Sequence, residues 1–391
     1  MQEAYVVAGL RTAIGKAKKG AFRHVRPDDL AVVVIESLVK QVSGLTPTAV
    51  DDVIVGTAVP EAEQGLQMAR WIALRSLAIE VPGVTINRYC GSGLEAIALA
   101  TAKIKCGMAD CIIAGGAESM SLVPTMGWKT APNFTLADDH AEYFLSMGLT
   151  AEEVAQEHRI TREESDAFAL ASHRRALAAR SAGYFQQEIV PVTVEEITVE
   201  KNHRTIHRTV VCEDEGPRPD TSLEALSKLP PVFRQDGQVT AGNASQTSDG
   251  AAFVVVLSEA MVKKLNVKPW ARLVTCVSAG VHPRLMGMGP VEAVPRALKR
   301  SGIRLQDVGV IELNEAFACQ ALAVMKALDL DPERVNPNGG AIALGHPLGC
   351  TGAVLTIKAV RQAQRQNQKY ALVTACIGGG QGIAAVFEVF S

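Results

Sequence analysis

Short apolar runs rich in β-branched residues alternate along the chain with longer segments in which apolar residues recur at helical spacing. The first pattern is typical of buried strands, and the second is typical of helices with one apolar face. Their alternation predicts an α/β fold. The runs expected to be strands are 4–8, 52–55, 84–86, 111–114, 253–257, 273–277, 308–312 and 371–375.

One helix is predicted shortly after the run 84–86. Apolar residues from Leu94 to Ile104 fall on a single helical face, and the helix is expected to stop near Gly107. The segment between strand and helix contains Cys90, followed by Gly91, Ser92 and Gly93. The sequence therefore places a thiol at the N-terminus of a helix.

The order of elements repeats within the chain. Near the front, 48–56 leads to Cys90, a helix, and then the run 111–116 with its glycine pair. Near the back, 304–312 leads to 348–352, a helix, and then 371–380. The two stretches share little identity but the same order of strand, turn, helix and strand, which predicts two similar halves.

A segment with a different sequence pattern, from about 119 to 242, separates the two halves. Polar and aromatic loops lead into a helical segment with two expected capping boxes, Thr150 with Glu153 and Thr161 with Glu164. The helices are expected to end at Gly183, and the charged, β-branched stretch 190–211 to form an exposed hairpin. An insertion of this size usually covers a site.

The composition excludes several classes of function. The chain has 391 residues, is 48% apolar and 20% charged, and carries a formal net charge of −2. Nothing in this balance indicates nucleic acid or a membrane surface as partner. No apolar run reaches membrane-spanning length.

The eight cysteines are widely spread, and none forms a CxxC pair, so no metal site is expected. The N-terminus shows no secretory or transit-type leader, which predicts reduced thiols and a cytoplasmic location. Five cysteines are interpreted as small packed side chains: Cys106, Cys111, Cys212, Cys276 and Cys319.

Cys90 is the first candidate for chemistry. A helix N-terminus favours thiolate over thiol, so a lowered pKa and fast alkylation are expected at this residue. Two alternatives stay open. The glycines could simply relieve crowding, or 91–96 could be the G-x-G-x-x-A of a dinucleotide-binding protein, with Glu118 as the ribose-binding acid. Against the second, residues 87–90 intervene between the strand and the first glycine.

Two later glycine-rich segments supply partners for such a thiol. His346 lies among five glycines between 339 and 352, and Pro347 follows it, so backbone could approach a ligand closely there. An imidazole is the natural base for a thiol. Cys376 precedes three glycines, whose amides could form an oxyanion hole. Asn314 follows a predicted strand, and a helix N-cap is its simplest alternative role.

Taken together, these segments resemble the thiolase family over essentially the whole chain. The matching motifs are 11–15, 90–93, 114–120, 240–245, 286–290, 314–317, 345–347 and 376–382. The resemblance implies two similar βαβαβαββ halves in five layers, α-β-α-β-α, with an inserted loop domain. The boundaries expected are 1–118 plus 243–270 for the first half, 119–242 for the loop domain that covers CoA, and 271–391 for the second half.

The resemblance also implies roles for individual residues. Cys90 is expected to accept the acyl group, His346 to activate it as a base, and Cys376 to act as acid and base on the substrate α-carbon or the CoA thiol. Asn314 would hold a water that stabilises an oxygen of the intermediate together with His346. The amides of Cys90 and Gly378 would form a second oxyanion hole.

Coenzyme A is expected as a co-substrate, with no permanently bound cofactor. The residues implied to contact CoA or the acyl group are Arg218 at the nucleotide end, Ser245 at the pantetheine, and Met147, Phe233, Met286 and Phe317 as apolar walls. Implied partners are acyl-CoA and CoA, a second copy of the chain in a homodimer or homotetramer, and other β-oxidation enzymes. Neither nucleic acid nor membrane insertion is implied.

The resemblance favours a degradative 3-ketoacyl-CoA thiolase that releases acetyl-CoA. Segments 214–219 and 243–250 resemble this type, and Ser146 stands where biosynthetic acetoacetyl-CoA thiolases usually carry His. The biosynthetic enzyme is the alternative, because the segment 376–380 also occurs there. A ketoacyl synthase is disfavoured by Cys376 as the second reactive group, and a non-catalytic lipid carrier by the presence of all the reactive residues.

Overall fold

The computed structural model describes residues 2–200 and 203–390. The strands are β1 Ala4–Arg11, β2 Gly15–Lys16, β3 Asp52–Gly56, β4 Gly83–Ile86, β5 Cys111–Ser119, β6 Val192–Glu200, β7 His203–Val211, β8 Ser248–Ser258, β9 Ala271–Gly280, β10 Val310–Leu313, β11 Tyr370–Ile377 and β12 Gln381–Val389. The helices are α1 Pro27–Gln41, α2 Met68–Ser76, α3 Ser92–Lys105, α4 Phe134–Asp139, α5 Met147–Glu157, α6 Arg162–Ser181, α7 Leu223–Ser227, α8 Glu259–Leu265, α9 Gly289–Ser301, α10 Ala318–Leu328, α11 Ala341–Leu344 and α12 Leu348–Arg365.

The main sheet consists of two similar parts. Its strand order is β10-β11-β12-β9-β1-β8-β5-β3-β4, and β2 pairs with β8. Among the described residues, the two parts of the sheet are joined where Val6 of β1 pairs with Ala271 of β9. In the first part β3 and β5 are parallel, and in the second β10 and β11 are parallel. The internal repeat predicted from the sequence is confirmed.

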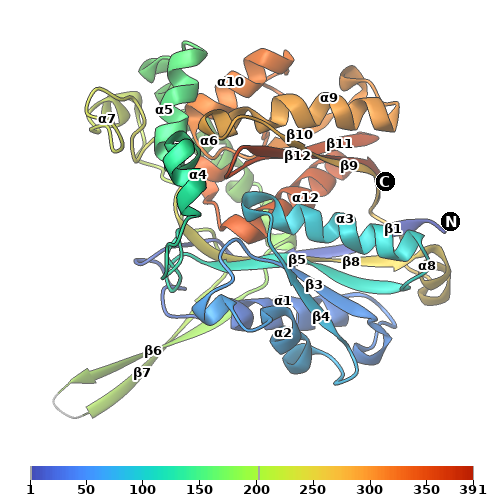
Figure 1. Cartoon of the computed structure of the whole chain (residues 1–391). Helices are drawn as coiled ribbons and strands as arrows, with labels where there is room; N and C mark the ends of the chain where they lie inside the picture. Colours follow the sequence, from blue (N-terminus) through green and yellow to red (C-terminus); the bar gives the residue numbers. More distant parts are fainter. Residues whose placement is uncertain (1, 201–202, 391) are drawn as a thin grey trace.

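The elements stack in five layers, as predicted (Figure 1). Helices α3 and α12 lie in contact between the two parts of the sheet. Helices α1 and α2 cover the outer face of the first part, and α9 and α10 cover the outer face of the second. Helix α12 is therefore buried at most of its positions, including the polar residues Thr351, Thr356 and Lys358.

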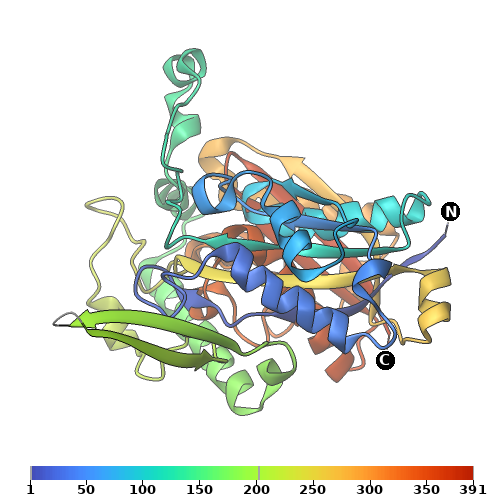
Figure 2. The ribbon, with the colours of Figure 1, turned by 90° about the horizontal axis from the view of Figure 1, so that it is seen from below.

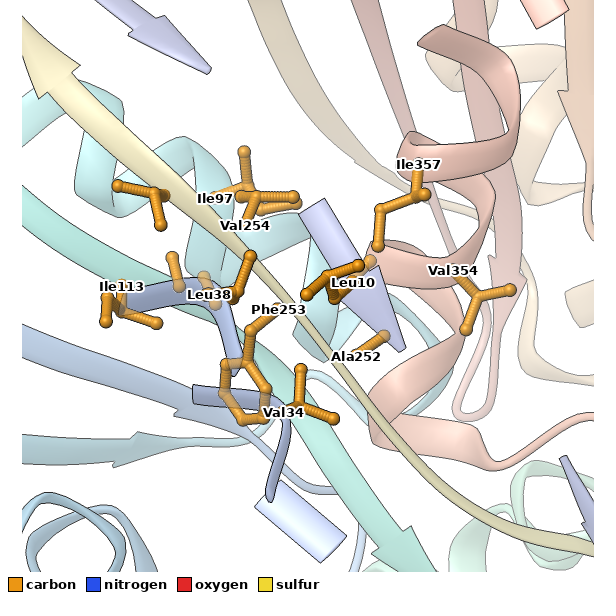
Figure 3. Close-up of a cluster of buried hydrophobic side chains, with 14 of the residues drawn as sticks. Leu10, Val34, Leu38, Ile97, Ile113, Ala252, Phe253, Val254, Val354 and Ile357 are labelled. Carbon is orange, nitrogen blue, oxygen red and sulfur yellow. The ribbon is translucent and has the colours of Figure 1, made fainter. Parts of the chain in front are cut away.

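The core of the first half forms on both faces of β8, whose residues are all buried. Figure 3 shows Phe253 pointing toward Val34 of α1, while the next residue, Val254, points toward Ile97 of α3. A strand buried on both faces needs apolar residues at successive positions, because neighbouring side chains point to opposite faces. This accounts for the uninterrupted apolar run 253–257 in the sequence.

Two glycines allow the central helices to approach closely at their N-terminal turns. A Cβ on Gly93 of α3 would lie 2.9 Å from the backbone nitrogen of Ala353 in α12. A Cβ on Gly352 of α12 would lie 2.2 Å from the backbone nitrogen of Leu94. Both distances are below van der Waals contact. The helix that follows Cys90 and the helix that follows His346 are thus held against each other.

The segment between the halves carries one error of the sequence prediction. Thr161 and Glu164 form the predicted capping box at the start of α6, and Gly183, with φ +74°, follows the end of this helix. Thr150 does not cap a helix. It lies inside α5, which already begins at Met147, and it donates to the Met147 carbonyl at 2.7 Å. Glu153 pairs with Arg234 and Arg284 instead.

The hairpin predicted over 190–211 is confirmed as the antiparallel pair β6 and β7, which projects from the body of the molecule (Figure 2). Its turn, at 201–202, lies outside the described residues. Of the helices in 2–200 and 203–390, none combines the length and apolar character needed to cross a membrane.

Candidate functional site

Cys90 lies in a tight turn between β4 and α3. The preceding residue, Tyr89, has a left-handed backbone with φ +42°, which is uncommon for a residue with a side chain. Ser92 stabilises the turn, since its hydroxyl accepts from the Arg88 amide at 2.9 Å and donates to the Tyr89 carbonyl at 2.7 Å. Cys90 as a whole residue is half-buried and lies at the N-terminal end of α3, where the sequence predicted it.

The predicted lowering of the Cys90 pKa is wrong. Burial raises the pKa of this thiol to about 11, and the negative charge of Glu118 acts in the same direction. Hydrogen bonds from the backbone amides of Gly378 and Cys90 favour the thiolate but do not overcome the loss of solvation. Cys90 is therefore a protonated thiol at neutral pH, with two amides directed at its sulfur.

Cys376 reaches the same place from the second half. It lies near the end of β11, where it pairs with Gly382 of β12, and its side chain is 1% exposed. Burial raises the pKa of Cys376, and the nearby Cys90 raises it further. The Cys90 thiol is thus close enough to disfavour ionisation of Cys376, and Gly378 follows Cys376 by two residues.

His346 is held on all sides in a buried position. Its backbone amide donates to the Gln246 carbonyl and to the Ser248 hydroxyl, both at 3.1 Å. The ring nitrogen Nε2 lies 3.3 Å from Asn314 Nδ2, and Nδ1 lies 2.6 Å from Thr351 Oγ1. Burial lowers the pKa of His346 to about 4, so the imidazole is neutral at neutral pH.

The backbone before His346 explains part of the glycine-rich motif. Gly345 has φ +111°, and a Cβ there would lie 2.4 Å from Ser248 Oγ. A side chain would therefore be strained in conformation and would collide with the hydroxyl that holds the His346 amide. This glycine lets the chain turn from α11 into the histidine.

Asn314 joins the two parallel strands of the second half. It follows β10, and its amide donates to the Thr374 carbonyl of β11 at 2.9 Å. The side chain is fully buried, and its Oδ1 has no partner among the described residues. The N-cap alternative is wrong, because α10 begins at Ala318 with Phe317 at the cap position.

The neighbouring residue, Glu315, ties this strand end to the loop before His346. Its buried carboxylate accepts from Ser172 Oγ at 2.7 Å, Asn336 Nδ2 at 2.9 Å and the Ile342 amide at 3.2 Å. Burial raises its pKa despite these hydrogen bonds. Glu315 thus holds together α6, β10 and α11, the elements around Asn314.

Several of the predicted apolar contacts lie together. A Cβ on Gly378 would stand 3.5 Å from the Met147 sulfur, which places Met147 beside the loop directed at Cys90. Phe233 and Phe317 pack edge to face, with ring centroids 6.3 Å apart. Met286 is buried at 2% exposure in the same hydrophobic cluster as Phe317 and Cys376.

Ser245 and Arg218, the two polar residues predicted to contact CoA, lie in different surroundings. The Ser245 amide donates to the Ala316 carbonyl at 3.0 Å, which places Ser245 beside Phe317. Arg218 is exposed, and its backbone amide donates to His173 Nδ1 at 3.2 Å. Among the described residues, no hydrogen bond or ion pair joins Arg218 to Cys90 or His346.

The dinucleotide alternative does not fit the geometry. Gly93 is used for contact between α3 and α12, and a Cβ on Gly91 would lie 2.6 Å from Ile377 Cδ1. Glu118 is 1% exposed and accepts from the amides of Ala58 and Gly349 at 2.7 and 2.8 Å. Neither the glycines nor the acid is open to a nucleotide.

Thr351, which contacts the His346 ring, was not predicted from the sequence. Glu118 was considered there only as a ribose-binding acid, whereas its carboxylate lies at the N-terminus of α12. For Thr351 a local signal existed. It comes four residues after Pro347 at the start of a helix, a spacing that turns a hydroxyl back toward the preceding turn. For Glu118 there was none, because its partners are far away in the sequence.

Comparisons with known proteins agree with this arrangement. Residues 4–260 match the family model described as the thiolase N-terminal domain, and 267–389 match that of the thiolase C-terminal domain. The 3-ketoacyl-CoA thiolase of Bacillus subtilis is 51% identical over the full length of both chains.

Two solved structures are also similar in fold. A Bacillus anthracis acetyl-CoA acetyltransferase has a TM-score of 0.90 at 38% identity, and human mitochondrial 3-ketoacyl-CoA thiolase has a TM-score of 0.89 at 41% identity. Each comparison covers 100% of this chain and 99% of the other.

Proposed function

Because this chain belongs to the thiolase family, we propose that it is an acyltransferase that cleaves 3-ketoacyl-CoA with CoA, releasing acetyl-CoA and a shortened acyl-CoA. One observation carries the assignment of residues. The sulfur of Cys90 receives a hydrogen bond from the amide of Gly378, which belongs to the other half of the chain and lies just after Cys376. A nucleophile, a second thiol and an amide donor thus meet at one point.

In the first step, His346 takes the proton of Cys90 as the sulfur attacks the 3-keto carbon. The new bond is the thioester between Cys90 and the shortened acyl group, and the bond broken joins the α- and β-carbons of the substrate. Acetyl-CoA leaves as its enolate, which takes a proton from Cys376. Because Cys90 rests as a thiol and His346 as neutral imidazole, proton transfer accompanies attack rather than preceding it.

In the second step, Cys376 removes the proton of the incoming CoA thiol. The CoA sulfur attacks the thioester, the acyl group leaves with CoA, and the Cys90 sulfur recovers its proton from His346. Both thiols and the imidazole return to their starting states. This is covalent catalysis in two half-reactions, and it requires no metal or redox group.

Two pairs of donors would stabilise the negative oxygens of the intermediates. The amides of Gly378 and Cys90 already point at the sulfur, so an oxyanion formed on the attacked carbon could occupy the same donors. His346 and a water held by Asn314 would serve the thioester oxygen of the enolate. The buried Oδ1 of Asn314, which lacks a protein partner among the described residues, supports a polar ligand there.

For the substrate we propose a path from the outer surface to Cys90. Arg218 would face the nucleotide end of CoA, Ser245 the pantetheine, and Met147, Phe233, Met286 and Phe317 the apolar walls. The edge-to-face pair of Phe233 and Phe317 and the position of Met147 beside Gly378 support this path.

The domain boundaries we propose are 1–118 with 243–270, 119–242, and 271–391. The place of β8 between β1 and β5 supports assigning the segment after 243 to the first half. A homodimer or homotetramer, partner enzymes of β-oxidation and a cytoplasmic location stay predictions.

The degradative direction is favoured over acetoacetyl-CoA synthesis. The Bacillus subtilis and human relatives named above are 3-ketoacyl-CoA thiolases. The biosynthetic alternative has one specific support, the Bacillus anthracis acetyl-CoA acetyltransferase that shares the fold over its whole length.

The test follows the enolate absorbance of 3-ketoacyl-CoA substrates of increasing chain length after addition of CoA. We expect CoA-dependent loss of absorbance with acetoacetyl-CoA and with longer chains. Absence of turnover at every length would overturn the proposed function. Turnover confined to acetoacetyl-CoA would instead support the biosynthetic alternative.

A further inference from the structure

We infer that Thr351 is a positioning residue that fixes the tautomer of His346, so that Nε2 is unprotonated and available as the base. The inference rests on the proposed function, in which His346 accepts the Cys90 proton. Thr351 lies in the first turn of α12, five residues after His346, and its side chain is buried. It would act through the imidazole and not on the substrate.

The hydrogen bonds of the Thr351 hydroxyl indicate which nitrogen of His346 carries the ring hydrogen. The Thr351 hydroxyl donates its only proton to the Pro347 carbonyl, at 3.1 Å. At 2.6 Å from His346 Nδ1 it is therefore an acceptor, and Nδ1 carries the ring hydrogen. A neutral imidazole has one such hydrogen, which leaves a lone pair on Nε2.

The other side of the ring agrees with this assignment. Asn314 Nδ2 lies 3.3 Å from Nε2, and an amide nitrogen can only donate. The Asn314 amide could not choose the tautomer by itself, because its Oδ1 has no other described partner that fixes the orientation. The Thr351 hydroxyl has a second partner, because the Pro347 carbonyl in the first turn of α12 can accept its proton.

The chemistry needs this choice of tautomer. With its hydrogen on Nε2, the ring would place a donor opposite the Asn314 amide nitrogen, and Nε2 could not accept the thiol proton in the proposed first step. With the hydrogen on Nδ1, Nε2 accepts the proton, and the imidazolium that results still donates from Nδ1 to Thr351. The threonine oxygen therefore serves both states of the base during each half-reaction.

The test compares Thr351→Val, which keeps the shape but lacks the hydroxyl, with Thr351→Ser, which keeps the hydroxyl. Thr356→Val is the matched control, because Thr356 is buried on the same helix and its hydroxyl donates to the Gly352 carbonyl at 2.8 Å without touching His346. The readouts are kcat and KM for thiolysis and the rate of Cys90 alkylation, each measured across pH.

We expect Thr351→Val to lower kcat roughly 10- to 100-fold, as for the loss of a hydrogen bond to a group that becomes charged, with little change in KM. Thr351→Ser should restore most of kcat, and Thr356→Val should resemble the unmodified protein. A general loss of packing would instead lower the activity of Thr351→Val and Thr356→Val alike. Equal kcat in Thr351→Val and the unmodified protein would overturn the inference.

A measurement on the unmodified protein covers the case in which Thr351→Val does not fold. Labelled histidine nitrogens show in NMR correlation spectra which ring nitrogen carries hydrogen, and the signal absent from His346→Gln identifies His346. We expect hydrogen on Nδ1, and hydrogen on Nε2 would contradict the inference. If the unmodified protein catalyses no thiolysis, the proposed function fails, while the tautomer measurement stands independently.

Discussion

At Cys90 two physical effects oppose each other. The N-terminus of α3 and the amides of Gly378 and Cys90 favour the thiolate, whereas burial favours the thiol. Burial is the larger effect, because removing a charge from water costs more than two backbone hydrogen bonds return. The sequence shows the helix N-terminus and cannot show the burial. For this reason the expected sign of the pKa shift was wrong although the position of the residue was right.

This balance predicts the pH dependence of Cys90 alkylation in the free protein. With a pKa raised to about 11, the thiolate fraction at neutral pH is small and rises with each increase in pH. The alkylation rate, followed by mass mapping of the Cys90 peptide, should therefore keep rising beyond pH 9. The exposed Cys212 provides the internal comparison. A plateau for Cys90 below pH 8 would show a lowered pKa and contradict this account.

At the scale of elements, short apolar runs predicted β1, β3, β4, β5, β8, β9, β10 and β11, with ends that differ by a few residues. Strand β12 was not predicted. It is extended because it pairs along its length with both β11 and β9. This strand therefore depends on pairing partners that are distant in the sequence. The contacts of Glu118, and of the His346 ring with Asn314, likewise join residues that are far apart in the sequence.

The contact between α3 and α12 gives a prediction at this scale. In Gly93→Ala the new methyl group would lie within 3 Å of the Gly349 carbonyl and the Ala353 amide, at 2.8 and 2.9 Å. The helices must separate, which should destabilise the protein by about 1–3 kcal/mol and lower activity as Cys90 and His346 move apart. Urea unfolding and thiolysis assays measure the two effects.

The matched control for this change is Gly280→Ala. No atom lies within 4 Å of a Cβ on Gly280, which ends β9 at the surface. This variant should stay within about 0.5 kcal/mol of the unmodified protein. Equal unfolding free energies for Gly93→Ala and Gly280→Ala would refute the proposed role of the glycine contact.

At the scale of the whole molecule, buried neutral histidines predict a loss of stability in acid. Burial lowers the pKa of His173 to about 4, with the charges of Arg218 and Lys16 acting in the same direction. In the unfolded chain the pKa is near 6.5, so the unfolded state binds more protons between the two values. Stability is therefore present above pH 6.5 and is lost as pH falls toward 4. His346 contributes with the same sign.

Urea unfolding at pH 7 and pH 5 measures this loss. In His173→Gln, whose amide oxygen can still accept from the Arg218 amide, the difference in unfolding free energy between the two pH values should shrink by roughly 1–2 kcal/mol. An unchanged difference would mean that His173 titrates normally in the folded protein.

The most direct test of the central claim is mass analysis of the acyl-enzyme. The protein is mixed with 3-ketooctanoyl-CoA in the absence of free CoA, and the adduct is located by peptide mapping. The account predicts a hexanoyl group on Cys90, one acetyl-CoA released for each adduct, and loss of the adduct when CoA is added. A shortened acyl group on Cys376 or another cysteine, or an adduct that retains the full 3-ketooctanoyl chain, would contradict the division of roles between Cys90 and Cys376.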